Sequence, residues 1–152
     1  MIISKKIVAF FLVMVMCVCS VGIVYAAATT YSTYRNFNVN FSGSTRNYDD
    51  RAIQDYNSTQ KSLQSRAYIM NKNSISHPAG YYGIQNQMCN GSGACIYSST
   101  WWYSSNACVG LEYGAAYYQK TPGNYRSNGA VAVYNGNTYT YDFTTNTPYT
   151  TL

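Results

Sequence analysis

Apolar and polar residues alternate along several short stretches of this chain, which is the pattern of β-strands. The clearest stretch is residues 34–41, where Phe37, Val39 and Phe41 fall on one face and asparagines fall on the other. Such a stretch predicts a strand that is buried on one side only. Four further stretches have the length and composition of strands: residues 62–70, 81–88, 96–103 and 107–119.

The strongest local prediction is a β-hairpin near the C-terminal end. Residues 130–134 and 137–143 are two alternating stretches, and Asn135 and Gly136 lie between them. The Asn-Gly pair supplies the positive φ angles of a type I′ turn, whose twist matches that of the flanking strands. We therefore expect two antiparallel strands joined by a two-residue turn.

The remaining segments lack a sustained period. Residues 27–33 are expected to be a flexible lead-in, residues 44–61 a charged loop with room for one helical turn, and residues 144–152 a loosely held tail. About seven strands with short connections and no amphipathic helix predict an all-β fold. Because the strand lengths are uneven, we expect an antiparallel two-sheet sandwich in preference to a barrel.

The first 26 residues have the design of a secretory signal peptide. Lys5 and Lys6 form a cationic start, residues 7–24 carry no charge, and alanines follow at residues 26–28. The alternative is a retained membrane anchor, because the apolar run just reaches the roughly 18 residues that can span a bilayer. The alanines and the lack of a basic stop-transfer cluster favour cleavage. We therefore expect a signal helix at residues 1–26 and a single secreted, extracellular domain at residues 27–152.

Tyrosine is the unusual feature of the composition, with 18 residues in a chain of which only 10% is charged. A tyrosine ring offers a large apolar area and a polar tip, which suits a binding face. Tyrosine is also a good strand residue that can fill a core. The sequence leaves both interpretations open.

The charge is mildly positive and scattered. The net charge is +5, and loss of Lys5 and Lys6 with the signal segment lowers it to 5 − 2 = +3. Nucleic-acid binding needs a basic patch or stripe, so nucleic acid is not the expected partner. A mild positive charge instead favours residence beside an anionic cell envelope.

Three cysteines follow the signal segment: Cys89, Cys95 and Cys108. In an oxidising compartment two of them are expected to pair. We favour Cys89 with Cys95, because the glycine-containing loop between them lets the two sulfurs meet without strain, while Cys95 with Cys108 stays open. The third thiol, Cys108 in the favoured case, is then either buried in a monomer or joins two copies as a disulfide-linked dimer.

No metal or cofactor site is predicted. His77 and the three cysteines do not have the spacing of a structural zinc site, in which ligands come as close pairs. A nucleophilic Cys–His pair is also not expected, because oxidation would consume the thiol.

Trp101, Trp102 and Tyr103 are the best candidates for a binding feature. Successive side chains of a strand point to opposite faces, so Trp101 and Trp102 cannot both be buried unless the strand is covered on both sides. One ring is therefore expected at the surface, where an aromatic face can stack on a sugar or lie at a lipid headgroup boundary. The alternative is a central strand with a covering loop.

The sequence contains few groups and motifs that are typical of enzyme active sites. The chain has only five acidic residues and has no G-x-S-x-G, phosphate-loop or HExxH motif. Glu112, between Gly110 and Gly114, is the one candidate acid or base, and it would make the chain a small secreted hydrolase. We favour pairing of Glu112 with a neighbouring arginine or exposure to solvent, and we expect no enzymatic activity.

These features predict a small secreted, non-enzymatic β-sandwich protein that acts at the cell envelope by binding. The leading hypothesis is a bacteriocin-like, antimicrobial role, with an envelope component or glycan as partner and contact with a membrane surface left open. The first alternative is a carbohydrate-binding module that uses exposed tryptophan and tyrosine. The second is the hydrolase that uses Glu112.

Overall fold

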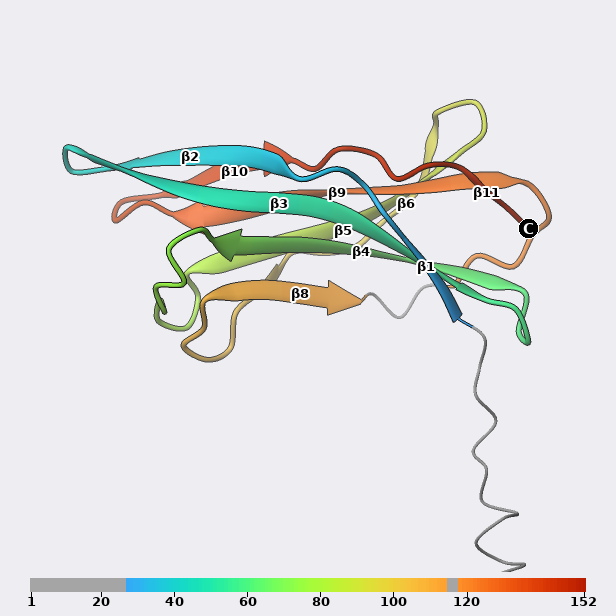
Figure 1. Cartoon of the computed structure of the whole chain (residues 1–152), viewed down its shortest axis with the longest axis horizontal. Helices are drawn as coiled ribbons and strands as arrows, with labels where there is room; N and C mark the ends of the chain where they lie inside the picture. Colours follow the sequence, from blue (N-terminus) through green and yellow to red (C-terminus); the bar gives the residue numbers. More distant parts are fainter. Residues whose placement is uncertain (1–26, 115–117) are drawn as a thin grey trace, which may run out of the picture.

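The computed structural model describes residues 27–114 and 118–152, and the expected signal helix at residues 1–26 lies outside the described residues. The described chain is all-β, with eleven strands (Figure 1). Within it, no helix is long and apolar enough to cross a membrane. The strands are β1 Ala27–Tyr31, β2 Arg35–Phe41, β3 Ser44–Asn57, β4 Ser62–Asn71, β5 Tyr82–Asn90, β6 Cys95–Ser98, β7 Trp102–Tyr103, β8 Gly110–Gly114, β9 Asn124–Tyr134, β10 Tyr139–Phe143 and β11 Thr150–Thr151.

The strands form two antiparallel sheets. In the first sheet, β1 and β2 pair with the two halves of β3, β4 pairs with its other edge, and β8 follows β4. In the second sheet, β5 pairs with β9, β10 and β11 pair with β9, and β6 and β7 pair with β5. The long strands of both sheets run along the long axis of the molecule in Figure 1. The expected all-β, antiparallel organisation in two sheets is confirmed.

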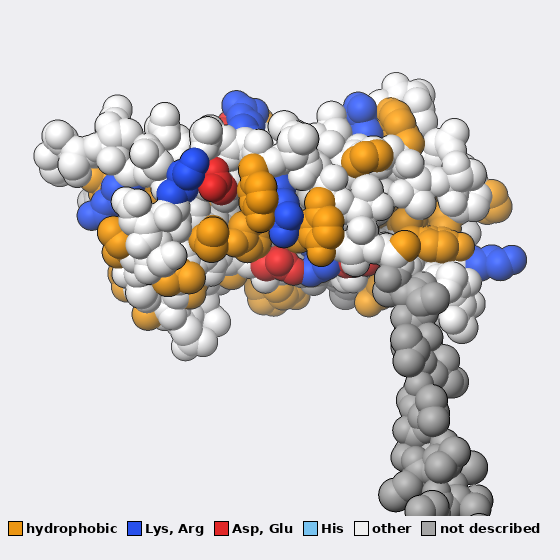
Figure 2. Space-filling model, in the orientation of Figure 1, with side chains coloured by type: hydrophobic (Ala, Val, Ile, Leu, Met, Phe, Trp, Pro, Cys, Tyr) orange, Lys and Arg blue, Asp and Glu red, His pale blue; other side chains and the backbone are white. Residues whose placement is uncertain are grey.

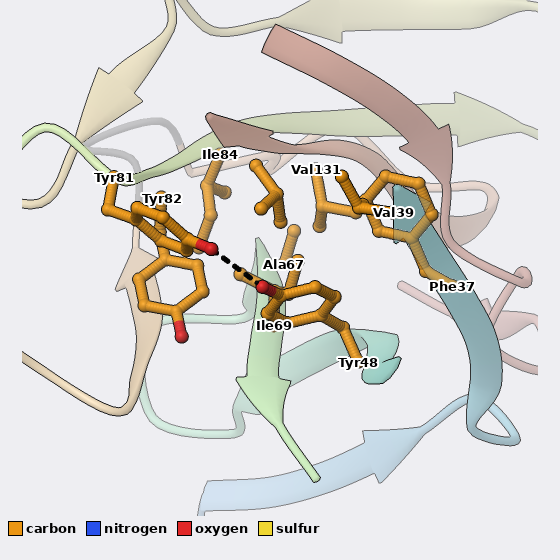
Figure 3. Packing of buried hydrophobic residues seen from close by; sticks show 10 residues of the cluster. Phe37, Val39, Tyr48, Ala67, Ile69, Tyr81, Tyr82, Ile84 and Val131 are labelled. Carbon is orange, nitrogen blue, oxygen red and sulfur yellow. Dashed lines mark hydrogen bonds between the residues drawn. The ribbon is translucent and has the colours of Figure 1, made fainter. Parts of the chain in front are cut away.

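The hydrophobic core contains residues from both sheets. Phe37 and Val39, alternate residues of β2, turn inward and are buried, as the sequence pattern predicts. They pack in one cluster with Ile69 of β4 and with Val131 and Val133 of β9 (Figure 3). Burial of each such side chain contributes about 1.5–3 kcal/mol to stability. An alternating strand therefore strongly prefers the orientation that turns its apolar face toward the core.

Part of the tyrosine content lies in this core. Tyr48 and Tyr82 are fully buried, and the hydroxyls of Tyr48 and Tyr81 share a hydrogen bond of 2.8 Å, drawn in Figure 3. The Tyr82 hydroxyl donates to the carbonyl of Val109 at 3.1 Å. Burial raises the pKa of Tyr48 and of Tyr82 well above the usual value, so both rings stay neutral.

A glycine allows β9 and β4 to approach closely across the core. A Cβ atom at Gly129 would lie 2.8 Å from the Cβ of Ala67 and 2.7 Å from the carbonyl oxygen of Gln85. No larger residue fits between these neighbours without moving backbone, so the two sheets lie close together where Gly129 faces Ala67.

The prediction of a loop at residues 44–61 is wrong. This segment contains the longest strand, β3, which has 14 residues. Tyr48, Asp50, Ala52 and Gln54 alternate along its buried face. Two of these four are polar, so the hydrophobic period that would reveal the strand is missing from the sequence.

The predictions of a flexible lead-in at residues 27–33 and a loosely held tail at residues 144–152 are also wrong. Residues 27–31 are not a flexible lead-in but form β1, which pairs with the end of β3. Residues 144–152 lie alongside β9, and their last part contains β11, which pairs with β9. The amides of Thr144 and Thr147 donate to the carbonyls of Gly129 and Ser127, each at 2.9 Å. Backbone pairing holds these segments, and pairing of this kind needs no apolar period.

Two predicted strands are shorter than expected. Residues 96–103 are divided into β6 and β7, which leaves Trp101 outside both strands. Within residues 107–119, only Gly110–Gly114 forms a strand, β8, while Gln119 makes an isolated bridge to Leu63. Residues 115–117 of that expected strand lie outside the described residues.

The hairpin of β9 and β10 is present, but its predicted turn is wrong. Tyr134 pairs with Tyr139, so the connection has four residues, 135–138, in place of two. The side-chain oxygen of Asn135 accepts hydrogen bonds from the amides of Asn137 and Thr138 at 3.0 and 2.9 Å. An asparagine that bonds the backbone ahead of it stabilises this wider loop, which outweighs the Asn-Gly preference for a type I′ turn.

Candidate functional site

Four aromatic side chains form a connected cluster on the outer face of the second sheet. We call Trp101, Tyr103, Tyr139 and Tyr141 the aromatic platform. Each ring contacts two others, with centroid separations between 4.9 and 6.3 Å. These separations fall in the range in which aromatic pairs attract each other beyond simple burial.

The strand register places the platform on the outside. Tyr141 pairs with Ala132, and Tyr103 pairs with Gly83. Val131 and Val133 point into the core, so their neighbour Ala132 faces outward. The side chains that share the face of Ala132 therefore turn away from the first sheet.

Small residues form the floor beneath the rings. A Cβ atom at Gly83 would lie 2.8 Å from a ring carbon of Tyr103 and 3.2 Å from the Cβ of Ala132. The missing side chain at position 83 leaves room for the Tyr103 ring to lie against the sheet. The rings are thus held by backbone and by one another, which limits their motion before any ligand binds.

The platform is open to solvent and extends beyond its four rings. Tyr141 is 53% exposed, and its neighbour on the same face of β10, Phe143, is 58% exposed. Tyr134 contacts Tyr139 at 5.5 Å between ring centroids. A recess of about 290 Å³ adjoins this end, with Pro78, Ala79, Gly80, Tyr81, Tyr134 and Tyr139 as its lining.

The platform is uncharged. Burial, followed by the neighbouring tyrosines, raises the pKa of Tyr103 and of Tyr139 above the usual value. Both hydroxyls therefore remain protonated at physiological pH and can donate hydrogen bonds. The Tyr139 hydroxyl donates to the carbonyl of Gly80, beside the recess. The site offers ring faces and neutral hydroxyls, and it offers neither a nucleophile nor a carboxylate.

The structure separates the three aromatic residues singled out from the sequence. Trp101 and Tyr103 belong to the platform, whereas Trp102 lies on the opposite side of β7. The Trp102 ring stacks on Tyr113 of the first sheet, with centroids 4.1 Å apart, and is 47% exposed. Sequence reasoning missed Tyr139 and Tyr141, although their alternation in residues 137–143 already placed them on one face.

The cysteines take the arrangement favoured from the sequence. Cys89 and Cys95 form a disulfide across the connection of β5 and β6. Cys108 is the free cysteine of the described residues, and it is half-buried beside the core. The backbone of Cys108 exchanges hydrogen bonds of 2.8 and 2.9 Å with that of His77.

His77 is a packed core residue. Its ring stacks on Tyr81 at 3.8 Å, and burial, followed by the charge of Arg46, lowers the pKa of His77. Among the described residues, no three His, Cys, Asp or Glu side chains gather as a metal site would require. The disulfide holds two of the four zinc candidates elsewhere, between β5 and β6.

Glu112 is engaged in an ion pair. Its carboxylate accepts a hydrogen bond from Arg66, which also donates to Asp55 at 2.9 Å. Asp55 lines a recess of about 470 Å³ at the end of the β3–β4 hairpin, and Tyr56, Asn57 and Tyr118 are among its walls. Both carboxylates are thus held by the same guanidinium, an arrangement that favours a structural role.

The chain matches no protein-family model, no curated protein and no solved structure.

Proposed function

We propose that this protein is a small secreted, non-enzymatic β-sandwich that binds a neutral glycan of a cell envelope through the aromatic platform. The observation that carries the proposal is the closed cluster of Trp101, Tyr103, Tyr139 and Tyr141, held rigidly on an exposed sheet face. Aromatic faces stack on the C–H faces of sugars, and rigid aromatic anchors dominate binding energies at protein surfaces.

The chemistry of the platform favours a neutral ligand. No charged side chain belongs to the platform, to its floor at Gly83 and Ala132, or to the adjoining recess. An anionic sugar would lose its hydration there and gain no opposite charge. Neutral sugar hydroxyls can instead bond to the tyrosine hydroxyls and to the backbone at the recess.

The surroundings of the carboxylates support the non-enzymatic proposal. Glu112 and Asp55 share Arg66, Asp49 pairs with Lys72, and Asp142 pairs with Arg35. A general acid or base must be free to exchange a proton with the substrate, whereas each of these four carboxylates is engaged by an arginine or lysine.

A bacteriocin-like action at the envelope is the biological role that we attach to this binding. Phe143 and Tyr141, two of the most exposed large hydrophobic residues, lie together at the β10 edge of the platform. Exposed aromatic rings also suit the headgroup boundary of a membrane. In the proposed sequence of events, the platform first binds the glycan. The β10 edge of the platform then contacts the membrane surface.

Binding to isolated envelope glycan tests the proposal. Trp101→Ala and Tyr141→Ala should each weaken binding about tenfold or more, because each removes a central stacking ring. Trp102→Ala is the matched control, since it removes an exposed indole outside the platform and should leave the affinity unchanged. Equal binding by the three variants, in protein with an unchanged circular dichroism spectrum, would remove the platform as the site. Turnover of glycan that is lost in Glu112→Gln would overturn the non-enzymatic proposal.

A further inference from the structure

A second cluster lies on the other side of the molecule, on the outer face of the first sheet. The guanidinium of Arg51, on β3, lies 4.2 Å from the ring centroid of Tyr31 and 4.5 Å from that of Tyr34. Tyr68 of β4 is 5.4 Å away and contacts Tyr34 edge-on. Tyrosine rings attract a guanidinium over their faces and hold it in place.

The other cations of this face are already paired. Arg66 binds Asp55 and Glu112, and Lys72 binds Asp49. The Arg51 side chain, by contrast, makes no ion pair or hydrogen bond with any described residue, and its Nε is buried without a partner. Arg51 as a whole is half-buried, and its two Nη groups, unlike Nε, are not among the buried atoms. A planar pair of donors of this kind matches the two oxygens of a carboxylate or phosphate.

We propose that Arg51, with Tyr31, Tyr34 and Tyr68, is a second binding site, which takes an oxyanion carried on a sugar ring. Tyr31 and Tyr34 are 48% and 54% exposed, so ring surface borders the cation on the side that faces solvent. A ligand that carries an anionic group next to an apolar ring face fits both features at once. The site is independent of the aromatic platform, because it lies on the other sheet and has the opposite preference for charge.

The charges around Arg51 restrict the ligand to a single oxyanion. The three cations of this face, Arg51, Arg66 and Lys72, are balanced by the carboxylates of Asp49, Asp55 and Glu112. Figure 2, which views this side, shows basic, acidic and hydrophobic side chains next to one another. A polyanion or an anionic membrane would meet these carboxylates as well, and their repulsion opposes its approach. A short acidic glycan can reach Arg51 alone.

Titration calorimetry of the full chain carrying Trp101→Ala, in which neutral binding by the platform is weakened, tests the site. The probes are a glucuronate oligosaccharide, a phosphorylated oligosaccharide and a neutral oligosaccharide of the same length. At least one acidic probe should bind more tightly than the neutral one, and the comparison between the two identifies the oxyanion. Arg51→Gln should weaken that binding by about tenfold or more, since it removes a charge-assisted pair of hydrogen bonds.

The controls separate this site from a structural contact and from the platform. Arg126→Gln is the matched control, because Arg126 also lies over a tyrosine, Tyr149 at 5.0 Å, but over one ring only. Arg51→Lys keeps the positive charge and loses the planar pair of donors, so this variant should stay folded and bind the acidic probe weakly. Trp101→Ala should leave acidic binding intact. The proposal would be overturned by equal affinities for the acidic and neutral probes, or by equal losses of affinity in Arg51→Gln and Arg126→Gln. Unaltered acidic binding in folded Arg51→Lys would also overturn it, and so would binding to anionic vesicles with no binding to the acidic oligosaccharides.

Discussion

The ring of Tyr103 lies directly over Gly83, its cross-strand partner, with no space for a Cβ atom between them. This contact connects the sequence to the proposed function. A glycine in a central strand weakens the strand, yet here its missing side chain is what allows the ring to lie against the sheet beside Tyr139 and Trp101.

Gly83→Ala should therefore displace Tyr103 and weaken glycan binding about three- to tenfold, since an aromatic contact contributes about 0.5–1.5 kcal/mol. The denaturation midpoint should fall as well, because the added Cβ atom also lies 3.2 Å from the Cβ of Ala132, which is fully buried and has little room to move. Gly91→Ala is the control, since a Cβ atom there meets nothing closer than 3.4 Å. Affinity and denaturation midpoint are measured for both variants. Undiminished affinity in Gly83→Ala would show that the position of Tyr103 is irrelevant to binding.

Asp50 should make the stability of the protein fall as the pH rises above about 4. Asp50 is fully buried, and neither carboxylate oxygen has a hydrogen-bond partner among the described residues. Burial, then the nearby carboxylate of Asp142, raises its pKa to about 7, against the opposing effect of Arg35. The unfolded chain ionises Asp50 near pH 4, so the folded state binds more protons between about pH 4 and pH 7. Stability should fall as pH rises through this window, by up to ~4 kcal/mol at about 1.4 kcal/mol per pKa unit.

Asp50→Asn should abolish this part of the pH dependence and raise the free energy of unfolding above pH 7. The amide keeps the shape of the carboxyl group and never ionises. Asp49→Asn is the control on the exposed side of the same strand. It removes the pair with Lys72 at 3.3 Å and should leave most of the decline in place, because the charge of Asp49 is the smallest of the effects that raise the pKa of Asp50. Urea denaturation across the pH range measures the difference, and parallel curves for Asp50→Asn and the parent chain would contradict the assignment.

Thiol titration under denaturing, non-reducing conditions should find one free cysteine per secreted monomer, which is Cys108. The other two are joined as Cys89–Cys95, and closing so short a loop adds only about 2 kcal/mol by the chain-entropy estimate. Three free thiols would refute the disulfide, and no free thiol together with a species of doubled mass would indicate a dimer through Cys108.

Secreted material should begin near residue 27, because the cationic start, apolar run and alanines at residues 1–28 match a cleaved signal peptide. N-terminal sequencing of culture medium and of membranes measures this directly. Intact Met1 in the membrane fraction would instead support the anchor.

The sequence was sufficient to predict the fold class and part of the candidate site. Phe37 and Val39 reveal β2, because their neighbours are polar and the period is complete. The same reasoning failed for β3, since Asp50 and Gln54 occupy buried positions that the rule reserves for apolar residues. Backbone pairing with β1, β2 and β4 forms this strand without a complete apolar period, and sequence periodicity does not report that pairing.

Only two of the four platform residues could be predicted from the sequence, for a different reason. Trp101 and Tyr103 are neighbours in sequence, and their residue types identified them as binding candidates. Tyr139 and Tyr141 come from a hairpin far along the chain, and they reach Tyr103 only through the order β7, β5, β9, β10. That order is a long-range property of the fold, so no local pattern contains it.

The most direct test of the account uses the two tryptophans as internal reporters, one within the platform and one outside it. Their indole N–H resonances are followed by NMR during titration with a soluble neutral oligosaccharide from envelope glycan. We expect the Trp101 resonance to shift with saturation while the Trp102 resonance stays in place. A shift of Trp102 without Trp101, or no shift of either at concentrations where binding is measured independently, would contradict the platform as the glycan-binding site.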